Sequence, residues 1–186
     1  MAILVLGGAG YIGSHTVYAL CEAGREVVVV DNLETGHVES VHPDAKFYQG
    51  DISDKAFIAD VFEKENISAV IHFAAYKAVG ESVAEPIMYY RNNLVSFLNI
   101  LESSKNHGGC NVLFSSSATV YGEAEKLPVT EQTPRLPATS PYGNTKQMCE
   151  DILRDTVKAT AAYGAEVNAG AQQLGPVKGI ALRYFN

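Results

Sequence analysis

Three residues of the chain have the types and spacing of an acid–base site: Ser117, Tyr142 and Lys146. Tyr142 and Lys146 are four residues apart, so on a helix their side chains lie on one face. An ammonium group beside a phenol favours the phenolate, and the pair therefore predicts a lowered pKa for Tyr142. Such a tyrosine can act as a general base toward a hydroxyl group. Taken alone, the pair is more often just two exposed side chains on an ordinary helix.

A glycine-rich turn near the start of the chain could hold a diphosphate. Gly7, Gly10 and Gly13 fit the pattern G-x-x-G-x-x-G, and the overlapping pattern G-x-G-x-x-G starts at Gly8. Glycines in this pattern allow a tight turn, close approach of backbone to a pyrophosphate and close helix packing. The following helix would direct its free N–H groups at the phosphates. An apolar run before the turn and a helical pattern after it favour this interpretation over a plain strand-to-helix turn.

Asp31 lies where a dinucleotide site needs a carboxylate. It ends an apolar run about 20 residues after the glycine turn, where it could accept hydrogen bonds from an adenosine ribose. A 2′-phosphate would be repelled there, so the sequence predicts NAD rather than NADP as the cofactor. The alternative is that Asp31 serves only the turn formed with Asn32.

The elements that would position these residues alternate between strands and helices. Apolar runs predict strands at 2–6, 26–30, 46–49, 69–73, 111–115 and 179–184, and helical patterns cover 11–23, 54–65, 84–106 and 141–161. Four prolines make 122–141 a loop, and the Ala- and Gly-rich segment 159–179 is predicted to be an insertion or flexible loop. The fold class predicted is α/β, a Rossmann-type doubly wound parallel sheet, with residues 1–186 as one dinucleotide-binding domain. Ser117, at the end of the fifth strand, would then face Tyr142 across the cofactor crevice.

Composition limits which binding partners and which cellular compartment are expected for the protein. The net charge of −7 disfavours nucleic acid, and the chain has no apolar run of the ~20 residues that span a membrane. Three widely spaced cysteines disfavour a disulfide framework or a metal site, and the start of the chain is unlike a signal peptide. We therefore expect a cytoplasmic protein with no metal and no membrane partner.

The chain resembles the extended short-chain dehydrogenase/reductase family, and within it the UDP-glucose 4-epimerase branch. The matching segments occur in family order and are GGAGYIGSHT, VDNL, GDI, IHFAAYKAVGES, YYRNN, FSSSATVYG, SPYGNTK and RYFN. Related 4,6-dehydratases usually carry acidic residues directly after the position of Ser117. Here Ala118 and Thr119 stand at those positions, which favours epimerisation over dehydration.

The resemblance implies a role for each matching residue. The catalytic residues would be Ser117, Tyr142 and Lys146. The cofactor-binding residues would be Gly7, Gly10, Tyr11, Ile12, Gly13, Asp31, Asn32, Asp51, Ile52, Phe73, Ala74, Ala75, Lys77 and Asn92, together with Tyr142 and Lys146. The substrate-binding residues would be Lys77, Ser117, Tyr142, Phe185 and Asn186, and Tyr184 would belong to the same region.

The activity implied is interconversion of UDP-glucose and UDP-galactose through transient oxidation at C4 of the sugar by tightly bound NAD. A homodimer is a further expectation from the resemblance. The family continues beyond RYFN into a smaller C-terminal domain that binds the UDP-sugar, whereas this sequence stops at Asn186. We therefore expect that substrate domain to be absent. Two alternatives remain open, namely an inactive NAD-binding module and a related nucleotide-sugar epimerase or dehydratase.

Overall fold

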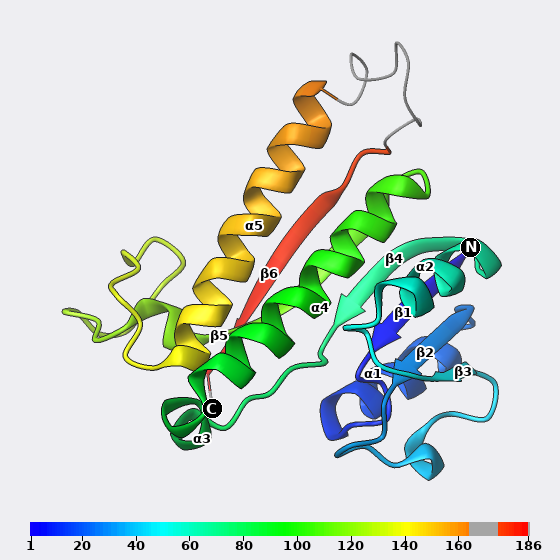
Figure 1. Ribbon diagram of the computed structural model, residues 1–186, viewed down its shortest axis with the longest axis horizontal. Coiled ribbons are helices and arrows are strands. Elements are labelled where there is room, and N and C mark those ends of the chain that lie inside the picture. The colour runs from blue at the N-terminus through cyan, green and yellow to red at the C-terminus, as the bar shows by residue number, and fades with distance from the viewer. Residues whose placement is uncertain (164–174, 186) are drawn as a thin grey trace.

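The computed structural model describes residues 1–163 and 175–185, which form one six-stranded parallel sheet with helices on its faces (Figure 1). The strands are β1 (Ala2–Leu6), β2 (Val27–Asp31), β3 (Lys46–Gln49), β4 (Ile67–His72), β5 (Asn111–Ser117) and β6 (Lys178–Tyr184). The helices are α1 (Tyr11–Glu22), α2 (Lys55–Lys64), α3 (Val79–Ala84), α4 (Pro86–Asn106) and α5 (Pro141–Tyr163), with short 3-10 helices at Val38–Ser40 and Ala118–Tyr121.

The strand order is β3-β2-β1-β4-β5-β6, and every neighbouring pair is parallel. The order reverses direction between β1 and β4, because the chain leaves β1 toward one edge and returns to the other side of it. Side chains at the carboxyl ends of strands meet above such a switch point, which is where this class of sheet binds ligands. The predicted Rossmann-type fold is thus confirmed.

Two apolar layers hold the helices on the sheet. One joins the sheet to α2, α4 and α5 and includes Leu4, Phe97, Phe114 and Leu153. The other lies beneath α1 and includes Val17 and buried side chains of β1 and β2. Figure 1 shows α4 and α5 side by side across one face of the sheet. No helix within residues 1–163 and 175–185 combines the length and apolar character needed to cross a membrane.

The helix predicted over 84–106 is α4, which begins at Pro86, and a short helix that was not predicted, α3, precedes it. The structure has two helices, α3 and α4, separated at Glu85, whose backbone has φ −124° and ψ 58°. A residue before proline is disfavoured in helical conformation, so the first helix ends there and the second begins with Pro86. The consequence for the site is that α3 becomes a separate short element next to Lys77.

Strand and helix limits shift by a few residues elsewhere. β4 begins at Ile67 rather than at the predicted residue 69, because the Ala2 N–H donates to the Asn66 carbonyl and extends the pairing with β1. The predicted insertion at 159–179 is helical as far as Tyr163 and is strand from Lys178 onward. Residues 164–174 of that predicted insertion lie outside the described residues.

Helix α5 ends at Tyr163, two residues beyond its predicted limit, and its last turns pack against the chain that leads into β6. Thr160 is buried, and its hydroxyl accepts a hydrogen bond from the Val177 N–H at 3.1 Å. The end of α5 therefore packs on the segment that leads into β6. That contact joins parts of the chain 17 residues apart, so it leaves no trace in local sequence pattern.

The far face of β6 is apolar and open. Ile180 and Leu182 alternate with Ala181 and Arg183, which face α5, and they are 63% and 41% exposed. Neighbouring apolar side chains of this kind favour self-association in solution. Solution measurements on this chain therefore need a fraction shown to be monodisperse.

His72 is a buried titratable group within the core. It lies at the end of β4 against the rings of Phe97 and Phe114, with ring centroids 5.4 and 5.9 Å away, and it is 1% exposed. Burial, assisted by the nearby charge of Lys146, lowers the pKa of His72 to about 3. The core therefore holds a neutral imidazole near neutral pH.

We expect His72 to make the protein sensitive to acid. The unfolded chain takes up a proton near the ordinary pKa of 6.5, whereas the folded chain does so only near 3. Stability from this group is therefore present above pH 6.5 and is lost as pH falls, by about 2 kcal/mol between pH 7 and pH 5. His72→Phe keeps the aromatic packing and should remove that part of the pH dependence, as measured by urea unfolding at both pH values. Equal pH dependence in both proteins would contradict this account.

Candidate active site

The glycine turn joins β1 to α1. A side chain at three of its glycines would clash with neighbouring atoms, whereas a side chain at the fourth would not. Gly7 has φ +77°, and a Cβ there would lie 2.8 Å from the Ala74 backbone nitrogen. A Cβ on Gly13 would lie 2.1 Å from the Gly7 oxygen, and one on Gly8 would meet Val29 at 2.7 Å. Gly10 has an extended backbone (φ −79°, ψ 173°), and a Cβ there would meet nothing closer than 3.4 Å. Packing within the described chain thus leaves space above Gly10.

The start of α1 is also left without a side-chain cap. Asp54 caps α2 by accepting from the N–H groups of Ala56 and Phe57, and the Ser140 hydroxyl accepts from the Gly143 N–H at the start of α5. At α1 the capping position is Gly10, which has no side chain to offer. The first-turn N–H groups and the positive end of the helix dipole therefore face the same open space.

Asp31 lies at the end of β2 and holds the edge of this space. Its two carboxylate oxygens accept from the Ala9 N–H at 3.0 Å and from the Leu33 N–H at 2.9 Å. The turn role considered for Asp31 is therefore present in the structure. A carboxylate has about four acceptor positions, so these two bonds leave capacity for a ribose hydroxyl as well.

Most residues predicted to bind a cofactor lie at the carboxyl edge of the sheet, with Gly7 after β1, Asp31 at the end of β2, Asp51 after β3 and Phe73 after β4. The N–H groups of Phe73 and Ala74 both donate to the Leu6 carbonyl, which brings the β4 loop against the glycine turn. Tyr11, Ile12, Asn32, Ile52, Ala75, Lys77 and Asn92 lie on the elements that flank this edge. Of these, Ile52 is buried, whereas Tyr11, Asn32 and Lys77 are exposed.

The two loops on either side of the glycine turn touch each other. The Tyr76 hydroxyl, from the β4 loop, donates to the Glu34 carboxylate, from the β2 loop, at 3.0 Å. Asn93 fixes the backbone of Tyr76 by accepting from its N–H at 2.9 Å and donating to its carbonyl at 3.0 Å. Asn93 also donates to the Thr145 hydroxyl on α5 at 3.1 Å. Sequence reasoning named Asn92 but missed Asn93, whose signal is an amide on the buried face of a helix.

The predicted catalytic residues converge beside β5. Tyr142 lies in the first turn of α5, and Ser117 ends β5 near enough for its hydroxyl to interact with the phenol of Tyr142. The Lys146 ammonium lies 5.8 Å from the centre of the Tyr142 ring and 4.7 Å from that of Phe114. Phe185 packs near Tyr121, with ring centroids 6.0 Å apart, and Asn186 lies outside the described residues. The structure thus brings the Ser, Tyr and Lys side chains together.

The predicted electrostatics of Tyr142 are wrong in sign. Burial raises the pKa of its phenol, and the interaction with Ser117 opposes that rise without reversing it. Lys146 donates to the Ser115 carbonyl at 2.8 Å, and burial lowers its own pKa to about 8. The prediction assumed a solvated ammonium beside a phenol. Instead, both groups are desolvated, and desolvation disfavours the charged form of each.

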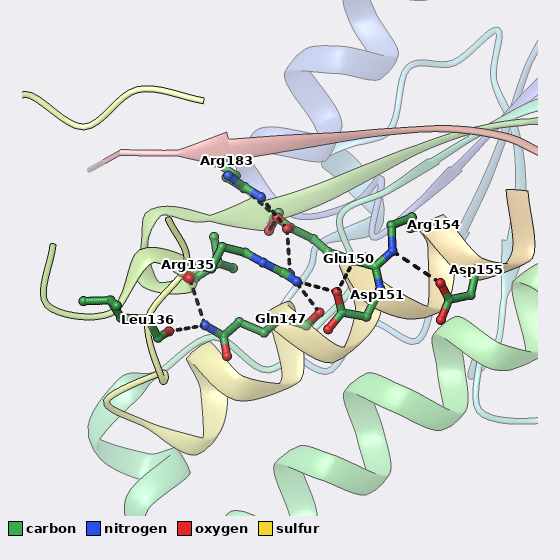
Figure 2. A network of polar contacts seen from close by, with 10 residues as sticks. Arg135, Leu136, Gln147, Glu150, Asp151, Arg154, Asp155 and Arg183 are labelled. Carbon is green, nitrogen blue, oxygen red and sulfur yellow. Dashed lines mark hydrogen bonds and ion pairs between the residues drawn. The ribbon is translucent and has the colours of Figure 1, made fainter. Parts of the chain in front are cut away.

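A network of charged residues supports this site from behind, and sequence reasoning missed it. Glu150 is 8% exposed and accepts from Ser116, Arg135 and Arg183 (Figure 2). Glu150 follows Lys146 by one helical turn, which is the only signal the sequence offers. Among the described residues, no three His, Cys, Asp or Glu side chains are grouped to hold a metal.

The chain is similar over its whole length to UDP-glucose 4-epimerases. It is 51% identical to that of Bacillus subtilis, matching 100% of this chain and 52% of the relative. It is 46% identical to that of Haemophilus influenzae, matching 100% and 53%. The crystal structure of the Bifidobacterium longum UDP-glucose 4-epimerase in complex with NAD+ and UDP superimposes with a TM-score of 0.87, at 42% identity, over 100% of this chain and 53% of that one.

The resemblance inferred from the sequence motifs is therefore confirmed, and the chain spans about half the length of these relatives. A family description also matches residues 4–171, which is most of the chain. By that match, the chain belongs to the family described as GDP-mannose 4,6 dehydratase.

Proposed function

We propose that this chain binds NAD at the glycine turn and interconverts UDP-glucose and UDP-galactose, with Ser117, Tyr142 and Lys146 as its catalytic residues. The observation that carries the proposal is the convergence of these three side chains at the carboxyl edge of a Rossmann-type sheet. The relatives at 44–51% identity are UDP-glucose 4-epimerases, and several related structures contain NAD. The substrate assignment is part of the proposal, because the chain matches only half of those proteins.

The residues at the glycine turn fit a dinucleotide. The space above Gly10 and the uncapped start of α1 offer a diphosphate both room and free N–H donors. Asp31 would accept from the adenosine ribose, and Lys146 would reach the nicotinamide ribose from α5. When bound, NAD would supply an acceptor that takes the C4 hydrogen of the sugar with its electron pair and returns it to the opposite face of C4 once the 4-keto sugar has turned over.

The protein's own residues would manage the proton. Tyr142 would take the proton of the sugar 4-hydroxyl as that hydrogen leaves C4, and it would return the proton when C4 is reduced. Ser117 would donate a hydrogen bond to the same sugar oxygen and orient it toward the phenol. Because the proton leaves and returns at one atom, a single base suffices for both directions of the reaction.

Dehydration, the reaction in the family description, is less well supported by the residues after β5. Elimination of water from the sugar requires an acid near the carbon that loses its hydroxyl. Ala118 and Thr119 directly follow Ser117, and neither carries a carboxylate. The described residues therefore favour epimerisation.

A turnover assay tests the proposal. Monodisperse protein with NAD is given UDP-galactose, and UDP-glucose is measured with a coupled dehydrogenase; a panel of other nucleotide sugars is run in parallel. Formation of UDP-glucose is the expected result. Tight NAD binding without turnover of any sugar would favour the non-catalytic binding module instead, and a 4-keto-6-deoxy product would favour dehydration.

Gly10→Ala should separate cofactor binding from folding. An alanine fits the extended backbone at this position, and its methyl group would enter the space above the turn. We expect NAD binding to weaken by about 10-fold or more, or ~1.4 kcal/mol, while stability changes by less than about 1 kcal/mol. Binding is measured by calorimetry and stability by urea unfolding. Gly80→Ala on α3, whose added Cβ would meet no atom within 4 Å, is the control. Equal NAD affinity in both variants would refute the proposed phosphate position.

A further inference from the structure

The end of β5 is held by two successive turns of α5. The Lys146 ammonium donates to the carbonyl of Ser115 at 2.8 Å, and the carboxylate of Glu150 accepts from the hydroxyl of Ser116 at 2.6 Å. Ser117 is the next residue along the strand. The helix that carries Tyr142 is thus hydrogen-bonded to the two residues immediately before Ser117.

The segment after Ser117 is held by the same helix. The Gln147 amide donates to the Val120 carbonyl at 2.8 Å and to the Leu136 carbonyl at 2.7 Å. Ser117 therefore lies between two attachments to α5, one made by Glu150 and the other by Gln147. Its position relative to Tyr142 depends on both.

Glu150 is itself fixed by two arginines from other parts of the chain. Arg183 of β6 donates to both oxygens of the carboxylate, at 2.8 and 2.7 Å, and Arg135 of the loop before α5 donates at 3.2 Å (Figure 2). With the Ser116 hydroxyl, the carboxylate accepts four hydrogen bonds, which is close to its full capacity. Arg183 also lies over the Tyr121 ring at 4.7 Å. A carboxylate held on all sides can fix Ser116 in one place.

We propose that Glu150 is a positioning residue that sets the distance between Ser117 and Tyr142 through its hydrogen bond with Ser116. The proposal rests on the proposed function in assigning chemistry to Ser117 and Tyr142. Glu150 touches neither the sugar nor the cofactor in this scheme, and Arg183 and Arg135 act by holding its carboxylate.

The decisive variant is Ser116→Ala, because it cuts the link to β5 while Glu150 keeps both arginines. Ser104→Ala is the matched control, since Ser104 is an equally buried serine whose hydroxyl contacts Cys110 away from the site. Asp155→Asn is a second control, which alters a surface ion pair with Arg154 on the same helix without touching Ser116, Glu150 or Arg135. Glu150→Gln extends the series, and the conclusion stands on Ser116→Ala if that variant does not fold.

Two measurements test whether Glu150 sets the position of Ser117 relative to Tyr142. The first is the ring-carbon NMR resonance of Tyr142 in protein with labelled tyrosine, assigned with Tyr142→Phe, which reports directly on the contact with Ser117. It should shift in Ser116→Ala and in folded Glu150→Gln, and it should stay unchanged in both controls. The second is turnover, where kcat should fall by about 10-fold or more at unchanged KM, since small misplacements of catalytic groups are costly.

The outcomes separate this inference from the proposed function. An unshifted Tyr142 resonance in folded Ser116→Ala would overturn the positioning role, whatever the enzyme activity. A wild-type protein that neither binds NAD nor turns over any nucleotide sugar would overturn the proposed function. In that case the resonance would still decide whether Glu150 positions Ser117.

Discussion

Replacing Tyr142 with phenylalanine is expected to lower turnover of UDP-galactose by about 10²–10⁴-fold, the usual contribution of a positioned general base. The variant removes one oxygen atom from a residue that is half-buried at the start of α5. The fold should therefore persist. A loss of kcat with an unchanged thermal transition is the expected pattern.

The pH profile of the wild-type protein gives an independent check on Tyr142. Burial raises the pKa of its phenol, so the group is mainly protonated near neutral pH. Because a base acts in its deprotonated form, kcat should increase as pH rises toward that pKa. Tyr142→Phe should lose this dependence. Tyr18→Phe, on the surface of α1, is the control, and similar turnover by Tyr142→Phe and Tyr18→Phe would refute the assignment.

Much of the fold could be predicted because its signals are local. β1 and β2 are continuous apolar runs, as expected for strands buried on both faces, and both are almost fully buried. α1 ends at Glu22, within one residue of the predicted limit at 23, and Gly24, with φ +69°, follows it in the conformation typical of a helix end. The start of α4 at Pro86 follows the predicted helix closely, whereas the short helix α3 just before it was not predicted. The proline restricts the backbone of Glu85 and so keeps the two helices apart.

The sequence identified the residues of the candidate site, but it did not predict the direction of their pKa shifts. Ser117, Tyr142 and Lys146 carry motif spacing that the sequence displays, and the structure brings them together. The direction of the pKa shift of Tyr142 depends on how much water reaches it, which only the packed fold determines. The same holds for Glu150, since its partners Arg135 and Arg183 lie 15 and 33 residues away.

Replacing Lys146 with methionine is expected to stabilise the protein at pH 7 while impairing its function. Lys146 is 4% exposed, and burial lowers its pKa from 10.5 to about 8. At pH 7 the folded protein must hold this ammonium in the core, at a cost of about 3 kcal/mol. Methionine is similar in length and uncharged. Allowing for the lost hydrogen bond to Ser115, a net gain of about 2 kcal/mol in unfolding free energy is expected.

The pH dependence of the unfolding free energy distinguishes removal of the buried Lys146 charge from improved packing as the cause of the stabilisation. Between pH 8 and pH 10.5 the unfolded chain binds the Lys146 proton more strongly than the folded chain does, so the wild-type protein should gain stability as pH rises. The advantage of Lys146→Met should therefore shrink over this range. Urea unfolding at pH 7 and near pH 10 measures it, with Lys158→Met, an exposed change on the same helix, as the control.

Function should move in the opposite direction, because Lys146→Met removes the only group proposed to reach the nicotinamide ribose from α5. Turnover should fall by about 10²-fold, as expected when a group that orients the reacting atoms is lost. A variant that is both less stable at pH 7 and fully active would contradict the whole account of Lys146. The reverse pattern would show that the fold retains a destabilising buried charge at the point where its chemistry requires one.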